Sequence, residues 1–186
     1  MNGKTHGFIG FGTIGQETAK RSKAFGTNII YYDPFRISEE NELDATYMSI
    51  NEVLEKSDIV SLHLPLHPET ENLITHRELT MMKNNAILIN VSRGGIVDEN
   101  ALAKALRNGD IAGAGIDVWE SEPPKIDHPL FKLENVITTP HIGAGTHDTL
   151  QRVLNMAFTN IGKVNKGEDP DYVVNNIKQA RITTKK

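Results

Sequence analysis

The sequence of 186 residues contains no cysteine, which excludes a disulfide framework and thiolate chemistry. It contains no run near the roughly 18 apolar residues of a membrane span, and its first residues lack the apolar core of a secretion signal. Its formal net charge of -4 provides no field that would gather nucleic acid or anionic lipid. We therefore expect a cytoplasmic protein with neither a nucleic-acid nor a membrane partner.

Strand-like and helix-like stretches alternate along the chain, and 38% of the residues are hydrophobic, enough for one globular domain. This alternation predicts an α/β fold with a doubly wound parallel sheet of the Rossmann type. We expect strands in the order 3-2-1-4-5-6, with the last three as neighbours. The six predicted strands cover residues 7–11, 28–32, 58–64, 86–91, 111–118 and 135–140.

Several predicted helices carry recognisable start signals. Ser49 with Glu52, and Thr75 with Glu78, fit capping boxes, and Asp98 fits the N-cap of a helix that Gly109 would end. A C-terminal helix is expected over about 146–167, and we predict a domain over 1–175 followed by a frayed tail, 176–186. The first helix shows helical spacing of Ile14, Thr18, Arg21, Ser22 and Phe25, with Gly26 as a left-handed cap.

Three glycines stand where the first strand turns into this helix. Gly10, Gly12 and Gly15 fit the spacing G-x-G-x-x-G. The first permits a tight turn, the second a close approach of a pyrophosphate, and the third close packing of helix on strand. Thr13 offers a hydroxyl donor, and Ile14 beside it is a further candidate cofactor contact. The motif in this context predicts a dinucleotide site.

Asp33 ends the second predicted strand, about twenty residues after the glycine loop. A carboxylate there can accept hydrogen bonds from the adenosine ribose and repel a 2′-phosphate. The alternative is that Asp33 only forms a turn before Pro34. Together with the glycines, it favours NAD over NADP.

Arg93, Glu122 and His141 follow the ends of three predicted neighbouring strands, where ligands of such sheets bind. A guanidinium binds a carboxylate, and an imidazole oriented by a carboxylate exchanges a proton near neutral pH. The set fits hydride transfer to a 2-oxo acid. Each residue alone also fits an ordinary structural role.

The sequence gives little support for a metal site. His63 and His67 are four residues apart, but Pro65 between them disrupts a helical pair of ligands. There is no cysteine and no H-E-x-x-H motif. We assign no metal.

The blocks GFGTIGQ, SLHLPLHPETENLI, INVSRGGIVDENAL, GAGIDVWESEPP and TTPHIGAGT, taken in order, closely resemble the NAD-binding domain of the D-isomer-specific 2-hydroxyacid dehydrogenases. The resemblance implies that Arg93 binds the substrate carboxylate and that Glu122 pairs with the catalytic His141. It also implies cofactor contacts for Asp117, Pro65 and, in the block after the histidine, Gly143.

The chain departs from the family pattern at two positions and in its organisation. His67 and Thr13 stand where the family often has Thr and Arg, and neither change threatens cofactor binding. Family members usually carry most of a substrate-binding domain before the glycine loop. We therefore expect this domain to be largely absent here, and a fragment or truncated form to have weak or no turnover alone.

The resemblance leaves several functions open. The first is NAD-dependent hydride transfer between a 2-hydroxy acid and a 2-oxo acid, with the particular acid undetermined. Formate dehydrogenase is disfavoured because it has Gln where Glu122 stands, whereas phosphite dehydrogenase keeps the Arg–Glu–His set. The alternative is an NAD(H)-sensing binding module resembling the related corepressors. Family members usually pair through this domain, so we expect a homo-oligomer.

Overall fold

The computed structural model describes residues 1–38 and 43–173 of the chain. They divide into two compact units, one that ends at His141 and one that begins at Ile142. The first unit is an α/β domain built on one sheet, and the described part of the second contains one long helix. The predicted tail, 176–186, lies outside the described residues.

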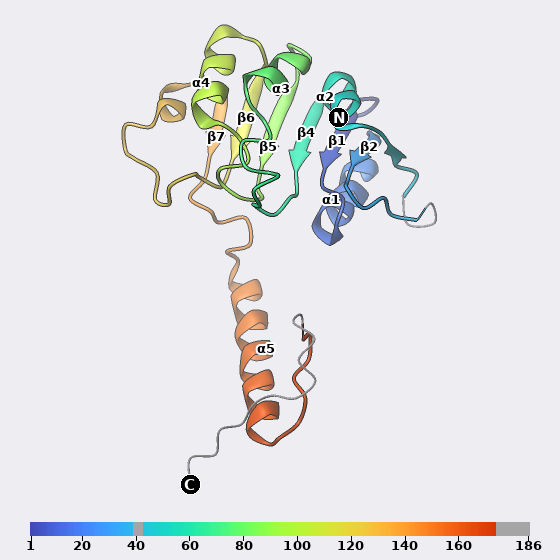
Figure 1. Ribbon diagram of the computed structural model, residues 1–186, viewed down its shortest axis with the longest axis vertical. Helices are drawn as coiled ribbons and strands as arrows, with labels where there is room; N and C mark the ends of the chain where they lie inside the picture. The colour runs from blue at the N-terminus through green and yellow to red at the C-terminus, as the bar shows by residue number, and fades with distance from the viewer. Residues whose placement is uncertain (39–42, 174–186) are drawn as a thin grey trace. The chain divides into compact units, whose positions relative to one another are not determined.

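The sheet of the first unit has seven parallel strands in the order β3-β2-β1-β4-β5-β6-β7 (Figure 1). This arrangement confirms the predicted doubly wound, Rossmann-type α/β fold. All strands run the same way, so the loops that follow them gather at one edge of the sheet. The strands are β1 (Thr5–Ile9), β2 (Asn28–Tyr32), β3 (Thr46–Tyr47), β4 (Ile59–Leu62), β5 (Ile87–Asn90), β6 (Gly113–Ile116) and β7 (Val136–Thr138).

The sequence missed β3, and this error changed the predicted position of one strand. β3 has only two residues, too few for a periodic pattern, and it pairs with β2 at the edge of the sheet. The strand predicted at 58–64, which is β4, therefore lies beside β1 and not outside β2. The expected adjacency of the last three strands is confirmed.

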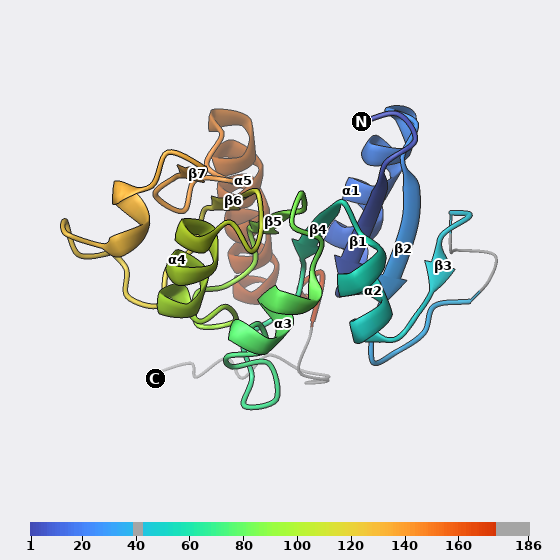
Figure 2. The same ribbon diagram turned by 90° about the horizontal axis from the view of Figure 1, so that it is seen from above.

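Helices cover both faces of this sheet (Figure 2). On one face, α2 (Ile50–Lys56), α3 (His76–Met81) and α4 (Glu99–Asn108) pack in a row over the larger core. On the other face, α1 (Thr13–Ala24) covers β1 and β2 over a smaller, aromatic core. A 3-10 turn, η2 (Pro129–Lys132), lies in the loop between β6 and β7.

The buried face of α1 differs from the one that the spacing predicts. Ile14 and Phe25 are 69% and 66% exposed, whereas Gly15, Ala19 and Ser22 are buried against the sheet. Small side chains let this helix approach β1 closely, so apolar size is a poor guide to its inner face. The predicted left-handed conformation of Gly26 is confirmed at φ +79°.

The predicted helix starts are confirmed in α2, α3 and α4. Ser49 and Glu52 form a capping box, and the Glu78 carboxylate accepts from both the backbone N and the Oγ1 of Thr75. Asp98 caps α4 by accepting from two backbone amides, and Gly109 ends that helix at φ +75°. These local contacts fix the loops that enter and leave the helices.

The second unit consists mainly of α5 (His147–Asn165), close to the predicted 146–167. Thr146 caps its start by accepting from Thr149 N at 3.1 Å. After the helix the chain turns back, and Asp171 contacts both Asn160 and Lys163. No residue of α5 is buried, so its predicted apolar face, which includes Leu150, Val153, Phe158 and Ile161, is exposed.

Candidate active site

The glycine loop joins β1 to α1, and its glycines occupy three different environments. A Cβ on Gly10 would lie 2.5 Å from the His63 carbonyl oxygen, and one on Gly15 would lie 2.7 Å from the Gly10 carbonyl oxygen. A Cβ on Gly12 would meet nothing within 4 Å. Gly10 and Gly15 therefore permit close backbone packing, while Gly12 leaves open space at the start of α1. No side chain caps this helix, so its first amides are available to an anion.

Asp33 is half-buried beside the glycine loop. Its Oδ2 accepts from Phe11 N at 2.7 Å, and its Oδ1 accepts from Phe35 N at 2.8 Å. The carboxylate thus fixes the glycine loop to the end of β2. Each oxygen retains a lone pair, so this structural role is compatible with the predicted contacts to ribose hydroxyls.

A pocket of about 180 Å³ lies between the start of α1 and the loops after β4 and β5. It contains three of the predicted residues: Ile14, Pro65 and Arg93. Thr13 is exposed at the first position of α1 and directly precedes the pocket residue Ile14 in the sequence. The remaining lining residues are His63, Leu64, Val91 and Ser92.

His63 is a pocket residue that the sequence reasoning considered only as a metal ligand. Its Nε2 is buried and has no hydrogen-bond partner within the described ranges. Burial lowers the pKa of its imidazole from 6.5 to about 4, so the ring is neutral at physiological pH. A buried nitrogen without a partner, beside an uncapped helix start, fits a site that a polar ligand completes. Its position directly after a strand end was the available signal.

Glu122 and His141 form the hydrogen-bonded pair that the sequence predicts. The His141 Nδ1 lies 3.0 Å from Glu122 Oε1 and 2.9 Å from Oε2, and the side chains are 45% and 43% exposed. The hydrogen bond to His141 holds the pKa of the Glu122 carboxyl below its usual value, helped by the Trp119 backbone N–H. With Nδ1 bound to the carboxylate, Nε2 is the nitrogen that can exchange a proton with a ligand.

Arg93 is exposed in the loop after β5. Its Nη1 donates to the Ser92 carbonyl at 2.6 Å, and its own carbonyl accepts from Asn90 Nδ2 at 3.1 Å. The following Gly94 is tightly packed, since a Cβ there would lie 1.8 Å from the Trp119 carbonyl oxygen. This contact brings the Arg93 loop against the loop that carries Glu122. Among the described residues, no hydrogen bond or ion pair links the Arg93 side chain to the Glu122–His141 pair.

Asp117 lies at the end of β6 and is only 5% exposed. Its Oδ1 accepts from Thr139 Oγ1, and its backbone N donates to the Asn90 carbonyl at 3.0 Å. It therefore ties together the ends of β5, β6 and β7. Gly143 belongs to the second unit, so its predicted cofactor contact stays a prediction.

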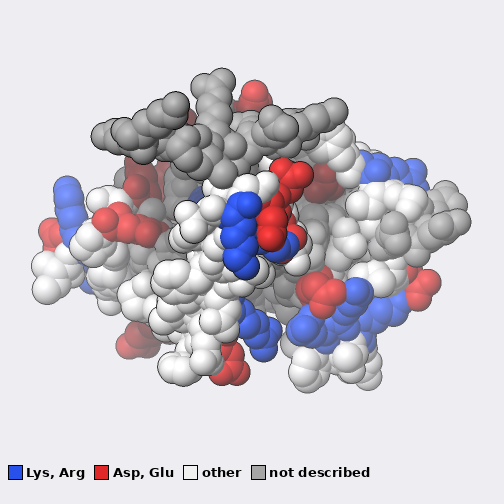
Figure 3. All heavy atoms as spheres, turned by 90° about the horizontal axis from the view of Figure 1, so that it is seen from below, with Lys and Arg blue, Asp and Glu red and all other residues white. Residues whose placement is uncertain are grey.

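Other kinds of site find little support over residues 1–38 and 43–173. No group of three His, Cys, Asp or Glu side chains in these ranges could hold a metal ion. No helix there has the length and apolar character needed to cross a membrane. On the one face drawn in Figure 3, Lys and Arg are interspersed with Asp and Glu. In α1, Glu17 pairs with both Lys20 and Arg21.

The sheet, the glycine loop with its uncapped helix, and the carboxylate after β2 define a dinucleotide-binding α/β domain, with an Arg and a His–Glu pair at the same edge. Residues 1–143 match the family described as "D-isomer specific 2-hydroxyacid dehydrogenase, NAD binding domain". The chain belongs to this family, and its cofactor is NAD.

Proteins of known structure and name support this assignment. The chain is 50% identical to the glyoxylate reductase of Thermococcus litoralis over 94% of its own length and 53% of the relative. It is 46% identical to the D-3-phosphoglycerate dehydrogenase of Methanocaldococcus jannaschii, over 98% of this chain and 35% of the relative. The NAD+ complex of Lactobacillus jensenii D-lactate dehydrogenase has a TM-score of 0.86 at 36% identity, covering 92% of this chain and 55% of the other.

The chain thus spans about half the length of several curated relatives that it matches. The part shared with them includes the NAD-binding domain, which the family match covers over residues 1–143.

Proposed function

We propose that this chain is the cofactor-binding part of an NAD-dependent dehydrogenase that interconverts a small 2-hydroxy acid and its 2-oxo acid. The observation that carries the proposal is the hydrogen bond of 2.9 Å between His141 Nδ1 and the Glu122 carboxylate. This bond leaves Nε2 as the nitrogen of the His141 ring that can exchange a proton with a substrate. The names of the relatives, a glyoxylate reductase and a D-3-phosphoglycerate dehydrogenase, support the 2-hydroxy acid class.

The residues fit NAD in three respects: the open space at Gly12, the uncapped start of α1, and the Nε2 of His63, which has no partner in the described part of the chain. The amides of the first turn of α1 would hold the pyrophosphate, and Asp33 would accept from the ribose hydroxyls. Thr13, Ile14 and Pro65 would line the same cleft, and Asp117 would contact the nicotinamide end. The cofactor contact of Gly143 stays a proposal. When bound, the cofactor supplies or accepts the hydride.

The chain's own groups handle the carboxylate and the proton. The exposed guanidinium of Arg93 binds the carboxylate of the acid and so orients its carbonyl group. His141 Nε2 donates a proton to the carbonyl oxygen during reduction and accepts it during oxidation. The Glu122 carboxylate holds the ring in place and stabilises its protonated form.

We also propose weak or no turnover by this chain alone. The His141 and Glu122 side chains are nearly half exposed, and proton transfer in water competes with transfer to the substrate.

The apolar face of α5, which is exposed, supports self-association. Light scattering at tens of micromolar protein is expected to show a species heavier than the 20.6 kDa chain, and a strictly monomeric result rejects that part of the proposal.

The test of the proposed function has two stages. Calorimetry with NAD and NADH is expected to show binding to this chain. NADH oxidation is then measured with glyoxylate, hydroxypyruvate and pyruvate, and NAD reduction with phosphite, on this chain and on any longer product of its gene. Failure to bind NAD(H) contradicts the proposal. Binding without turnover in every product indicates the sensing module, and turnover of phosphite alone changes the substrate class.

A further inference from the structure

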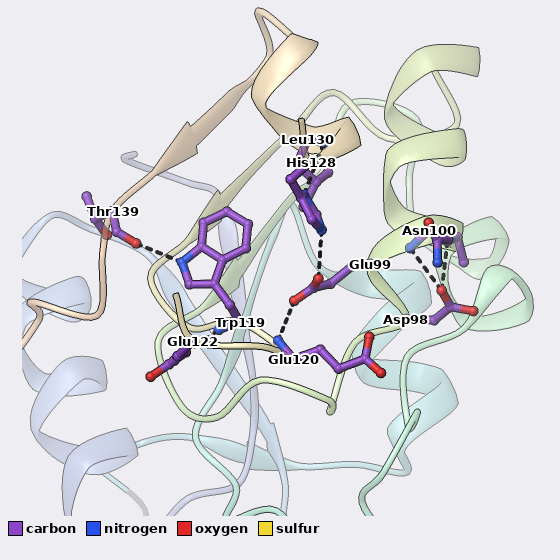
Figure 4. A network of polar contacts seen from close by, with 10 residues as sticks. Asp98, Glu99, Asn100, Trp119, Glu120, Glu122, His128, Leu130 and Thr139 are labelled. Atoms are coloured by element: carbon purple, nitrogen blue, oxygen red, sulfur yellow. Dashed lines mark hydrogen bonds and ion pairs between the residues drawn. The ribbon is translucent and has the colours of Figure 1, made fainter. Parts of the chain in front are cut away.

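Glu99 is a buried carboxylate at the start of α4 that has no part in the proposed chemistry. Its side chain is 11% exposed and makes two contacts with one loop. Oε1 accepts from the backbone N of Glu120 at 2.7 Å, and Oε2 lies 2.8 Å from His128 Nε2 (Figure 4). These contacts fix the loop between β6 and η2 on both sides of Glu122.

The hydrogen bonds of His128 define its tautomer. Its Nδ1 accepts from Leu130 N at 3.3 Å, so the ring proton resides on Nε2 and is donated to Glu99. The side chain is 14% exposed and packs edge-on against Trp119, with ring centroids 5.3 Å apart. Both nitrogens of His128 are therefore used inside the protein, and none remains for a substrate.

Trp119 connects the buried Glu99–His128 pair to the exposed Glu122–His141 pair. Its backbone N donates to Glu122 Oε1 at 3.2 Å, and its indole Nε1 donates to the Thr139 carbonyl at 3.1 Å, two residues before His141. Figure 4 shows Trp119 between Glu122, Thr139 and His128. Both members of the Glu122–His141 pair thus depend on where Trp119 lies.

We infer that Glu99 and His128 are positioning residues, which hold the loop 119–128 so that Glu122 meets His141. Their action on the reaction rests on the proposed function. The positioning itself involves only side chains and backbone of this chain. Neither residue touches the pocket beside Arg93, so both act through Trp119 and the backbone of Glu120.

The test compares Glu99→Ala with Asp98→Ala in the unliganded chain. Asp98 caps the same helix through Asn100 N and Ala101 N. Its loss destabilises α4 and leaves both contacts of Glu99 to the loop in place. Carbon NMR of labelled glutamate carboxyls follows the titration of Glu122, and the imidazole nitrogen shifts of His141 follow the other end of the pair.

In Glu99→Ala we expect the pKa of Glu122 to rise toward its ordinary value, the His141 shifts to change, and turnover in an active product of the gene to fall roughly tenfold with NAD affinity unchanged. In Asp98→Ala only the unfolding midpoint is expected to fall. The inference is overturned if the two variants change the pKa of Glu122 equally. It is also overturned if Glu99→Ala changes neither this pKa nor the His141 shifts. Because the titration needs no turnover, its result is independent of the proposed function.

Should Glu99→Ala fail to fold, Glu99→Gln provides the test. The amide oxygen can accept from Glu120 N, but the amide nitrogen is a donor and opposes the Nε2–H of His128. We expect a smaller change in the same direction. A folded Glu99→Gln variant with the Glu122 titration and His141 shifts of the parent chain contradicts the inference.

Discussion

Two His–Glu pairs lie in the same half of the sheet and differ mainly in exposure. His128 Nε2 meets Glu99 at 2.8 Å with side chains 14% and 11% exposed, whereas His141 Nδ1 meets Glu122 at 2.9 Å with side chains 45% and 43% exposed. In the buried pair both ring nitrogens have partners. In the exposed pair, Nε2 has no partner among the residues that the structure describes. The same two groups thus serve packing in one place and proton exchange in the other.

A His–carboxylate contact alone therefore does not identify a catalytic pair. What separates the two pairs is the second nitrogen of the ring and its access to a ligand. The variants of Arg93, the buried histidines and Asp33 extend this contrast, from the largest expected effect to the smallest.

Replacing Arg93 tests whether the exposed side of the site handles substrate. In a gene product that turns over a 2-oxo acid, Arg93→Ala is expected to lower turnover by roughly 10²-fold or more, because the carboxylate loses its bidentate partner. NAD affinity, measured by calorimetry, is expected to change little. Arg107→Ala, at the exposed end of α4, is the matched control and should retain the parent rate. Parent-level turnover in Arg93→Ala would show that another group binds the acid.

Lowering the pH tests two buried histidines that have no carboxylate partner in residues 1–38 and 43–173. Burial lowers the pKa of His6 and of His63 from 6.5 to about 4. Between pH 6.5 and pH 4 these histidines are therefore protonated in the unfolded chain but largely neutral in the folded chain. The free energy of unfolding falls as the pH drops through this range. At pH 5 the loss in free energy of unfolding is at most about 2 kcal/mol for each histidine. Urea denaturation between pH 7 and pH 5 measures it.

A variant separates this effect from general acid sensitivity. His6 lies between Ser22 Oγ at 2.8 Å and Ser61 Oγ at 2.9 Å, so His6→Asn removes one of the two titrating groups. Its stability is expected to depend less steeply on pH than that of the parent chain. His76→Asn, at an exposed position, should keep the parent slope. Equal slopes in all three proteins would contradict the assignment.

Asp33 combines a structural role with a proposed binding role. It holds the glycine loop, and it would also accept from the ribose hydroxyls. Asp33→Asn keeps an oxygen acceptor for Phe11 N and removes the charge that repels a 2′-phosphate. We expect the preference for NAD over NADP to narrow roughly tenfold in calorimetry. Glu55→Gln, on the exposed surface of α2, is the charge-matched control. An unmutated chain with equal affinity for both cofactors would reject this role of Asp33.

The sequence predicted those features that local chemistry determines. The caps at Ser49, Thr75 and Asp98 need only nearby residues, and six strands were recognisable from apolar runs. β3 was missed because two residues carry no pattern. The inner face of α1 was wrong because its buried residues are small, so hydrophobic size gave no signal.

The same distinction holds for the site. Glu122 and His141 were predicted to meet because each follows the end of a neighbouring strand, and parallel strands end at one edge. Glu99 and His128 were not predicted, although they are as close. Glu99 resembles any acid in the first turn of a helix, and its partner lies 29 residues away in an irregular loop, so only the folded chain reveals the contact.

The most direct test of the contrast between the pairs makes the same substitution at both histidines. His141→Asn and His128→Asn are compared for turnover, in the shortest gene product that reduces a 2-oxo acid, and for the urea midpoint. Asparagine tolerates the φ of +55° at His141. We predict that His141→Asn loses roughly 10²-fold or more in turnover at an unchanged midpoint, whereas His128→Asn lowers the midpoint and loses about tenfold in turnover. Parent-level turnover in His141→Asn, or equal losses in the two variants, would contradict the account.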